Sequence, residues 1–191
     1  MLSSKEHTAE LNQGKKKALV IGISKYDKLQ PLDLCENDAE ELSRVLGGLG
    51  YEISDEYKLI GYVSYDSLKK AINRFFKCNK REETLLLYYS GHGLPDGRGK
   101  HYLAPSDIDP EDPFDKGFDF ESLQYVAEDS NSSRRLTILD CCFSGAAGLE
   151  GETKKANDIA IAQEARNVID TRMRESEGTY LLASSLAFQQ S

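Results

Sequence analysis

The stretch Ala18-Leu19-Val20-Ile21-Gly22-Ile23 is short, continuously apolar and partly β-branched. Such a run is typical of a strand that is buried on both faces of a parallel sheet. Further segments share this character and are predicted to be strands: Thr84–Tyr89, Leu136–Leu139, Thr179–Ala183 and Tyr57–Ile60. The sequence therefore predicts about five strands.

Helical patterns lie between these strands. They cover Asp38–Leu49, Tyr65–Cys78, Asp119–Glu128 and Ala156–Met173. In the first of them, Asn37 or Asp38 is a candidate N-cap and Gly50 a stop signal. Because strands and helices alternate, we expect an α/β fold with a largely parallel sheet of five to six strands and helices on both faces.

The length of 191 residues fits one domain. Residues 1–14 are polar and without sustained periodicity, so we expect a flexible leader followed by a single domain over 15–191. Within that domain, Leu94–Phe118 is rich in Gly, Pro and Asp and predicts a surface excursion with a small hairpin around Lys100–Leu103. Gly148–Lys155 is a second predicted loop.

Net charge, apolar stretches and cysteine content limit the partners, the location and the disulfide bonding that we expect. The formal net charge of -8 argues against nucleic acid or an anionic membrane as the main partner. No apolar stretch reaches the ~20 residues of a membrane span, and the first residues lack the apolar core of a signal peptide, so we expect a cytoplasmic protein. Four cysteines are too few and too unevenly spaced for a disulfide scaffold, which predicts free thiols.

Two of the predicted strands run directly into chemically reactive residues. Thr84–Tyr89 leads into Ser90-Gly91-His92-Gly93, and Leu136–Leu139 leads into Asp140-Cys141-Cys142-Phe143-Ser144-Gly145. In parallel sheets, ligands gather at the carboxyl ends of the strands. A thiolate there needs an imidazole to accept and return its proton, a role that His92 fits, and the N–H groups of Gly93 and Cys142 are natural donors to an oxyanion.

These motifs resemble the caspase and metacaspase group of cysteine peptidases, because Cys142 follows His92 by 50 residues. The first strand with its continuation Ser24-Lys25-Tyr26, the Glu36-Asn37-Asp38-Ala39 stretch and the segment His101–Asp107 are also similar to that group. The resemblance implies the caspase-haemoglobinase fold, with His92 as the base, Cys142 as the nucleophile and Cys141 as a buried bystander.

The resemblance also carries expectations about partners. It implies a large-subunit part that needs a small-subunit segment of the same domain, with Gly151–Gly178 as an activation loop. It further implies a regulated effector in stress, death or defence signalling, switched on by a sensor protein.

The likeness is to metacaspases and prokaryotic caspase-like proteins, because Asp140 stands two residues before Cys142, whereas Phe143 stands where metacaspases often have His. The expected substrate-binding residues are Asp38, Asp140 and Ser184. Two carboxylates would attract a cation, so the expected activity is cleavage of proteins or peptides after Arg in preference to Lys. The competing interpretation of Asp38 is a helix cap.

Other interpretations stay open. A zinc site of His92, His101 and the cysteines fits no standard spacing, and Gly91-His92-Gly93 lacks the third glycine of a nucleotide loop. Ser144 lacks the surroundings of a nucleophilic serine. No metal or cofactor is expected in the chemistry, although the acidic run of residues 107–112 keeps calcium as an alternative. The alternative functions are a catalytically silent caspase-like interaction module and a nucleotide-binding α/β domain.

Overall fold

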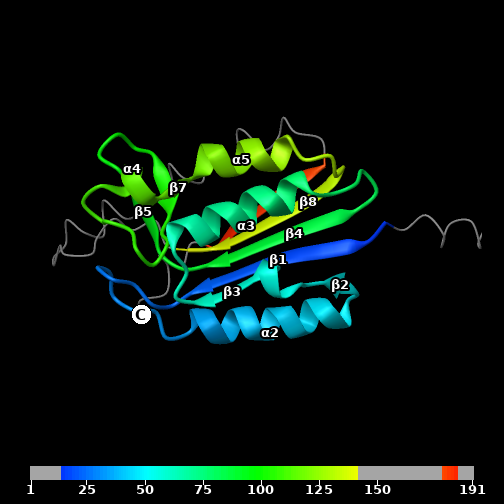
Figure 1. Ribbon diagram of the computed structural model, residues 1–191, viewed down its shortest axis with the longest axis horizontal. Coiled ribbons are helices and arrows are strands. Elements are labelled where there is room, and N and C mark those ends of the chain that lie inside the picture. Colours follow the sequence, from blue (N-terminus) through cyan, green and yellow to red (C-terminus); the bar gives the residue numbers. More distant parts are fainter. Residues whose placement is uncertain (1–13, 142–177, 185–191) are drawn as a thin grey trace, which may run out of the picture.

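Strand β1 (Lys16–Ile23) is part of a parallel, six-stranded sheet in the computed structural model, which describes residues 14–141 and 178–184 (Figure 1). The other strands of this sheet are β2 (Tyr51–Glu52), β3 (Lys58–Gly61), β4 (Thr84–Ser90), β8 (Arg134–Asp140) and β9 (Thr179–Ser184). The spatial order is β2-β1-β4-β8-β9, and β3 also pairs with β1. The predicted parallel sheet is confirmed, and only the two-residue strand β2 was not predicted.

Helices cover both faces of the sheet, as the alternation of strands and helices predicted. Helix α2 (Cys35–Gly48) packs on one face against β1 and β4, whereas α3 (Tyr65–Lys77) and α5 (Phe120–Glu128) contact each other on the opposite face (Figure 1). The predicted helix over 156–173 and the predicted loop over 148–155 lie outside the described residues.

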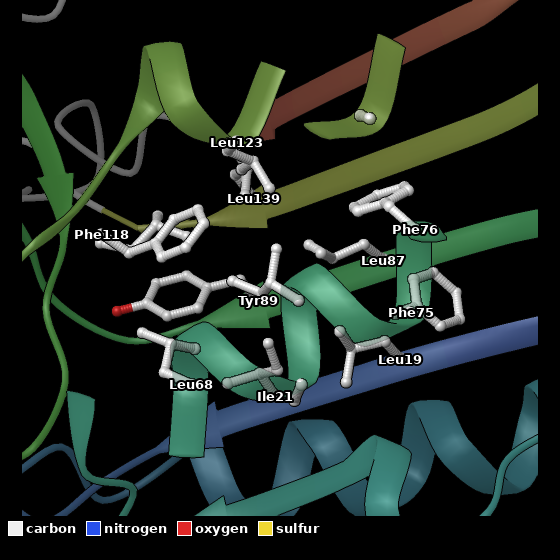
Figure 2. Close-up of a cluster of buried hydrophobic side chains, with 14 of the residues drawn as sticks. Leu19, Ile21, Leu68, Phe75, Phe76, Leu87, Tyr89, Phe118, Leu123 and Leu139 are labelled. Atoms are coloured by element: carbon white, nitrogen blue, oxygen red, sulfur yellow. The ribbon is translucent and has the colours of Figure 1, made fainter. Parts of the chain in front are cut away.

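The strands supply side chains to two separate apolar clusters. Leu19, Ile21 and Tyr89 lie in the larger cluster beneath α3 and α5 (Figure 2), and Val20 and Tyr88 lie in the smaller cluster beneath α2. Successive residues of a strand point to opposite faces, so a strand with both faces covered needs an unbroken apolar run. This packing explains the character of the central strands.

The excursion between β4 and α5 forms a second, antiparallel sheet. The strands of this sheet are β5 (Gly93–Pro95), β6 (His101–Leu103) and β7 (Phe118–Asp119). The short helix α4 (Pro113–Lys116) lies between β6 and β7 in the chain. The pairing of β5 with β6 confirms the predicted hairpin. Buried Leu94, Ala104 and Ile108 pack with Leu29, which belongs to the loop after β1, so the excursion lies against that loop.

Helix α2 begins one turn earlier than the sequence indicated. Its N-cap is Leu34, without a side-chain capping bond, and the N–H of Asp38 already donates to the Leu34 carbonyl at 2.9 Å. The prediction of Asn37 or Asp38 as N-cap, and with it the cap interpretation of Asp38, is therefore wrong. The stop signal at Gly50 is confirmed, because Gly50 adopts a φ of 82°, which favours glycine.

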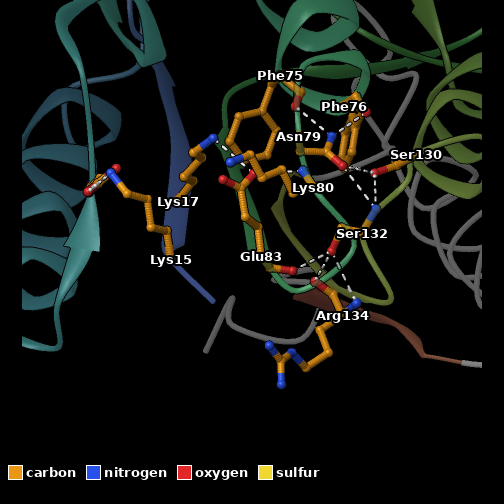
Figure 3. Close-up of polar contacts among 11 residues, drawn as sticks. Lys15, Lys17, Phe75, Phe76, Asn79, Lys80, Glu83, Ser130, Ser132 and Arg134 are labelled. Carbon is orange, nitrogen blue, oxygen red and sulfur yellow. Dashed lines mark hydrogen bonds and ion pairs between the residues drawn. The ribbon is translucent and has the colours of Figure 1, made fainter. Parts of the chain in front are cut away.

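A buried polar network joins the amino-terminal ends of the strands (Figure 3). The hydroxyl of Ser132, whose residue is 1% exposed, donates to the Glu83 carbonyl at 2.6 Å, and the Ser132 N–H donates to Asn79 Oδ1 at 2.9 Å. The Glu83 carboxylate pairs with Lys17 at 2.9 Å. Every polar group named here has a partner, which is what burial requires.

The expectations about free thiols and about membrane spans can be compared with the described residues. Cys35 and Cys78 carry free thiols there, in agreement with the prediction. Over residues 14–141 and 178–184, none of the helices combines the length and apolar character needed to cross a membrane.

Candidate active site

The two motif-bearing strands end side by side. In the parallel pairing of β4 with β8, Ser90 lies opposite Asp140, and the Gly91 N–H donates to the Asp140 carbonyl at 3.3 Å. His92 therefore follows β4 at the edge of the sheet where β8 ends with Asp140. Cys142 itself, like Ser144, lies outside the described residues.

Cys141 points into the protein. It is 6% exposed and belongs to the larger apolar cluster, so it is buried as expected. Leu139 of the same strand lies in the same cluster, whereas Asp140 between them is half-buried and outside it. The alternation of β8 thus separates the Cys141 thiol from the Asp140 carboxylate.

The imidazole of His92 has a defined orientation. Its Nε2 atom lies 2.8 Å from the carbonyl oxygen of Gln30, in the loop between β1 and α2. Since a carbonyl oxygen only accepts hydrogen bonds, this contact places a proton on Nε2 and leaves the lone pair of the neutral ring on Nδ1. Burial lowers the pKa of His92 from its ordinary 6.5, and the bond to Gln30 offsets this in part. The half-buried ring is therefore kept neutral and basic at Nδ1.

Two tyrosine hydroxyls hold the backbone of His92. The Tyr26 oxygen accepts the His92 N–H at 2.9 Å, and the Tyr89 hydroxyl donates to the His92 carbonyl at 2.7 Å. The Tyr26 and His92 rings also contact each other, with centroids 4.8 Å apart. Neither Gln30 nor a role for Tyr26 was predicted from the sequence. The available signal was an aromatic residue just beyond the carboxyl end of β1, at the edge where His92 leaves β4.

Asp38 and Asp140 approach one group of residues on the face covered by α2. Burial, and then the charges of both carboxylates, raise the pKa of Tyr88 to about 12, and the same factors raise the pKa of the Cys35 thiol. Ser90 bonds to both groups and lowers each pKa in part. Asp38 from α2 and Asp140 from β8 therefore lie near the same two side chains.

The backbone of Ser184 lies next to that of Asp140. It is the last residue of β9 and lies opposite Asp140 in the parallel register. The predicted residues Asp38, Asp140 and Ser184 thus come from a helix and two strands that meet at one end of the sheet.

Gly93 is the first residue of β5 and pairs with Leu103 of β6. The neighbouring bond runs from the Ala104 N–H to the His92 carbonyl at 3.0 Å, so Gly93 and Leu103 form a non-hydrogen-bonded pair. The N–H groups of such a pair point away from the partner strand. The Gly93 N–H is therefore directed away from β6.

The alternative metal sites can be examined in the described residues. Residues 14–141 and 178–184 contain no group of three or more His, Cys, Asp or Glu side chains arranged to hold a metal ion. In the acidic run, Asp107 pairs with Lys116 at 3.2 Å and Asp109 with Lys28 at 2.6 Å. These two carboxylates tie the excursion to itself and to the loop after β1.

Comparison with known proteins assigns the family. A family model described as a caspase domain matches residues 15–188, so the chain belongs to the caspase-domain family. It is 28% identical over 155 residues to metacaspase-1 of Botryotinia fuckeliana, covering 70% of this chain and 35% of that protein. Metacaspase-1 of Ajellomyces capsulatus is 28% identical over 152 residues, with 70% and 42% covered. The chain spans 35% of the length of the first of these relatives and 42% of the second.

Solved structures give the same fold. A protein from Geobacter sulfurreducens superimposes with a TM-score of 0.55 at 18% identity, covering 85% of this chain and 66% of that one. The structure of pro-sf-caspase-1 gives a TM-score of 0.50 at 17% identity, with 73% and 49% covered. The expected caspase-type α/β fold is thereby confirmed.

Proposed function

We propose that this chain carries the catalytic part of a cysteine endopeptidase that cleaves proteins after basic residues, Arg in preference to Lys, through Cys142 and His92. The observation that carries the proposal is the protonation and orientation of the His92 ring. Its ring is neutral, its Nε2 proton is engaged by Gln30, and its basic Nδ1 is available at the edge of the sheet where β8 leads to Cys142.

The proposed chemical steps involve His92, Cys142, the peptide substrate and water. Nδ1 of His92 accepts the thiol proton of Cys142, and the thiolate attacks the carbonyl carbon of the scissile peptide bond. The C–N bond breaks as His92 gives the proton to the leaving amine. A water molecule, deprotonated by His92, then cleaves the thioester, and the proton returns to the thiol as sulfur leaves.

The negative charge of the tetrahedral intermediates needs donors that are already in place. The Gly93 N–H is the proposed first donor, because it points away from β6 and is not used in pairing with that strand. The Cys142 N–H is the proposed second donor.

Specificity for a basic side chain follows from the acidic end of the sheet. Asp38 and Asp140 both act on Cys35 and Tyr88, which supports one pocket with two carboxylates. A planar guanidinium can meet two carboxylates at once, whereas an ammonium acts as a point charge. Arg is therefore the preferred residue before the scissile bond, and an acidic side chain would be repelled.

The proposed biological setting follows the family resemblance. It is that of a cytoplasmic, regulated effector in stress, death or defence signalling that acts on protein substrates after a sensor protein switches it on. A small-subunit segment would pair along β9, which lies at the end of the strand order in the described residues.

Matched fluorogenic peptides that end in Arg, Lys or Asp test the proposed function. With its small-subunit segment present, the protein should cleave the Arg peptide fastest, the Lys peptide more slowly and the Asp peptide least, and Cys142→Ala should cleave none of them. A preference for Asp would refute the specificity, and activity that survives in Cys142→Ala would refute the assigned nucleophile.

A further inference from the structure

Tyr26 lies three residues beyond the end of β1 and contacts His92 in two ways. Its hydroxyl oxygen accepts the His92 N–H at 2.9 Å, while the hydroxyl proton is donated to the Ile23 carbonyl at 3.0 Å. Its ring packs on the imidazole, with centroids 4.8 Å apart and planes inclined by 60°. The hydroxyl therefore fixes the backbone of His92, and the ring limits rotation of its side chain.

The Tyr26 hydroxyl works together with a second, fully buried one. Tyr89 donates to the His92 carbonyl at 2.7 Å and accepts the Ala104 N–H at 3.1 Å. Both polar groups of the His92 backbone are thus held by phenolic oxygens. Burial raises the pKa of both phenols well above the ordinary value of 10.0, which keeps each hydroxyl protonated in its bonded role.

Gly91 gives the two hydroxyls room to approach. A Cβ atom at this position would lie 2.8 Å from the Tyr89 hydroxyl and 2.9 Å from the Tyr26 hydroxyl, closer than side-chain carbons pack. The approach of the two tyrosine hydroxyls therefore favours glycine at the position before His92.

The loop that carries Tyr26 also carries the acceptor for Nε2. Gln30 lies four residues beyond Tyr26, and the loop is anchored by bonds from Asp27 N–H to the Ser106 carbonyl and from Leu32 N–H to the Ser24 carbonyl, both 2.9 Å. One anchored loop thus contacts the backbone, the ring and the Nε2 atom of His92. Because the loop fixes the backbone, the ring and the Nε2 atom of His92, it also fixes the direction in which Nδ1 points.

We infer that Tyr26 is a positioning residue for the proposed peptidase reaction, acting through its hydroxyl on the His92 backbone and through its ring on the imidazole. The inference rests on the proposed function, in which Nδ1 of His92 accepts the nucleophile's proton. Small misplacements of a catalytic group are costly, with about a hundredfold in rate for roughly 1 Å.

Two substitutions separate the contributions of hydroxyl and ring. Tyr26→Phe keeps the ring and removes the acceptor for the His92 N–H, so kcat on the Arg peptide should fall about tenfold with KM unchanged. Tyr26→Ala removes both contacts, so kcat should fall about a hundredfold. The matched control is Tyr62→Phe, which removes the bond from an exposed tyrosine hydroxyl to Asp27 and should leave kcat unchanged.

A spectroscopic readout tests Tyr26 without any turnover. In ¹⁵N-labelled full chain, the His92 amide proton should shift upfield and exchange faster in Tyr26→Phe, and Tyr62→Phe should match the unsubstituted chain. In Tyr26→Ala, the ¹⁵N shifts of the ring should also lose their preference for the Nε2–H tautomer.

The outcomes distinguish the two proposals. If the protein cleaves no peptide with its small-subunit segment present, the proposed function fails, while the amide and tautomer measurements still decide the role of Tyr26. If the chain is active and Tyr26→Phe retains full kcat and an unchanged His92 amide, the inference about Tyr26 is overturned. An equal loss of kcat in Tyr62→Phe would overturn it as well, because the effect would then be general to the fold.

Discussion

Ser90 and Asp140 lie directly opposite each other at the last positions of β4 and β8. In a parallel pair, opposite residues point to the same face, so both side chains lie on the side of the sheet that α2 covers and on which Asp38 is found. Substrate specificity can therefore be tested by neutralising the two carboxylates one at a time.

Asp38→Asn and Asp140→Asn should each lower kcat/KM for the Arg peptide, on the order of tenfold to a hundredfold, because an unpaired substrate charge would be desolvated in the pocket. The double variant should lose less than the product of the two single losses, since both carboxylates meet one guanidinium. Glu41→Gln, which neutralises an exposed acid of α2, is the control. Unchanged kcat/KM in both single variants would contradict the two-carboxylate pocket.

His92 should titrate below 6.5, because burial favours its neutral form. A folded pKa below the unfolded one means that the unfolded chain takes up the proton first. The stability contributed by neutral His92 is thus complete above about pH 6.5 and is lost as the pH falls through the folded pKa. For the same reason, the acid limb of kcat/KM should lie below pH 6.5. An NMR titration of the ring, with the urea-unfolded chain as reference, measures the difference, and a folded value at or above the reference would contradict it.

The adjacent cysteines should behave differently. Cys142→Ala should abolish peptide cleavage, whereas Cys141→Ala should retain most of it and lower the free energy of unfolding by about 1 kcal/mol, because Cys141 packs in the apolar cluster. Peptide cleavage and urea denaturation measure the two effects. An inactive Cys141→Ala variant with native stability would exchange the roles of the two residues.

Ser132→Ala should destabilise the protein without affecting catalysis. The substitution removes the Ser132 hydroxyl, which donates to the buried Glu83 carbonyl at 2.6 Å. Leaving this carbonyl without its donor should lower the free energy of unfolding by about 1–3 kcal/mol. Ser133→Ala is the matched control, because its exposed hydroxyl makes a single 3.2 Å bond to the Arg81 carbonyl and should cost less than about 0.5 kcal/mol. Equal midpoints of urea denaturation for the two variants would argue against a stabilising role of the network in Figure 3.

The periodic parts of the chain were predictable from the sequence. A buried strand or helix face requires apolar residues at a fixed spacing, so the local sequence pattern predicts the element. Examples are the apolar run of Ala18–Ile23 in β1 and the apolar residues Leu68, Ile72 and Phe75 on one face of α3. The first turn of α2 was missed because Leu34 caps the helix without a side-chain signal, and β2 and β7 are each only two residues long.

The site was predictable only where a motif stands at the end of a strand. His92 and Asp140 could be assigned in this way, and the register places them at the same edge. The roles of Tyr26 and Gln30 depend on the path of an aperiodic loop, and Gln30 acts through a backbone carbonyl that every residue possesses. Nothing in the side-chain pattern could have identified that contact.

The pairing of β4 with β1 and β8 has a consequence for how the protein matures. Residues that face each other across these pairs, such as Gly22 and Ser90 or Ser90 and Asp140, are separated by 68 and 50 positions along the chain. Pairing between such distant segments makes folding slow, because the intervening chain must first be closed into a loop. The acidic residues and the histidine assemble only when this step is complete. A newly synthesised chain is therefore expected to lack the proposed peptidase activity while its sheet is unformed.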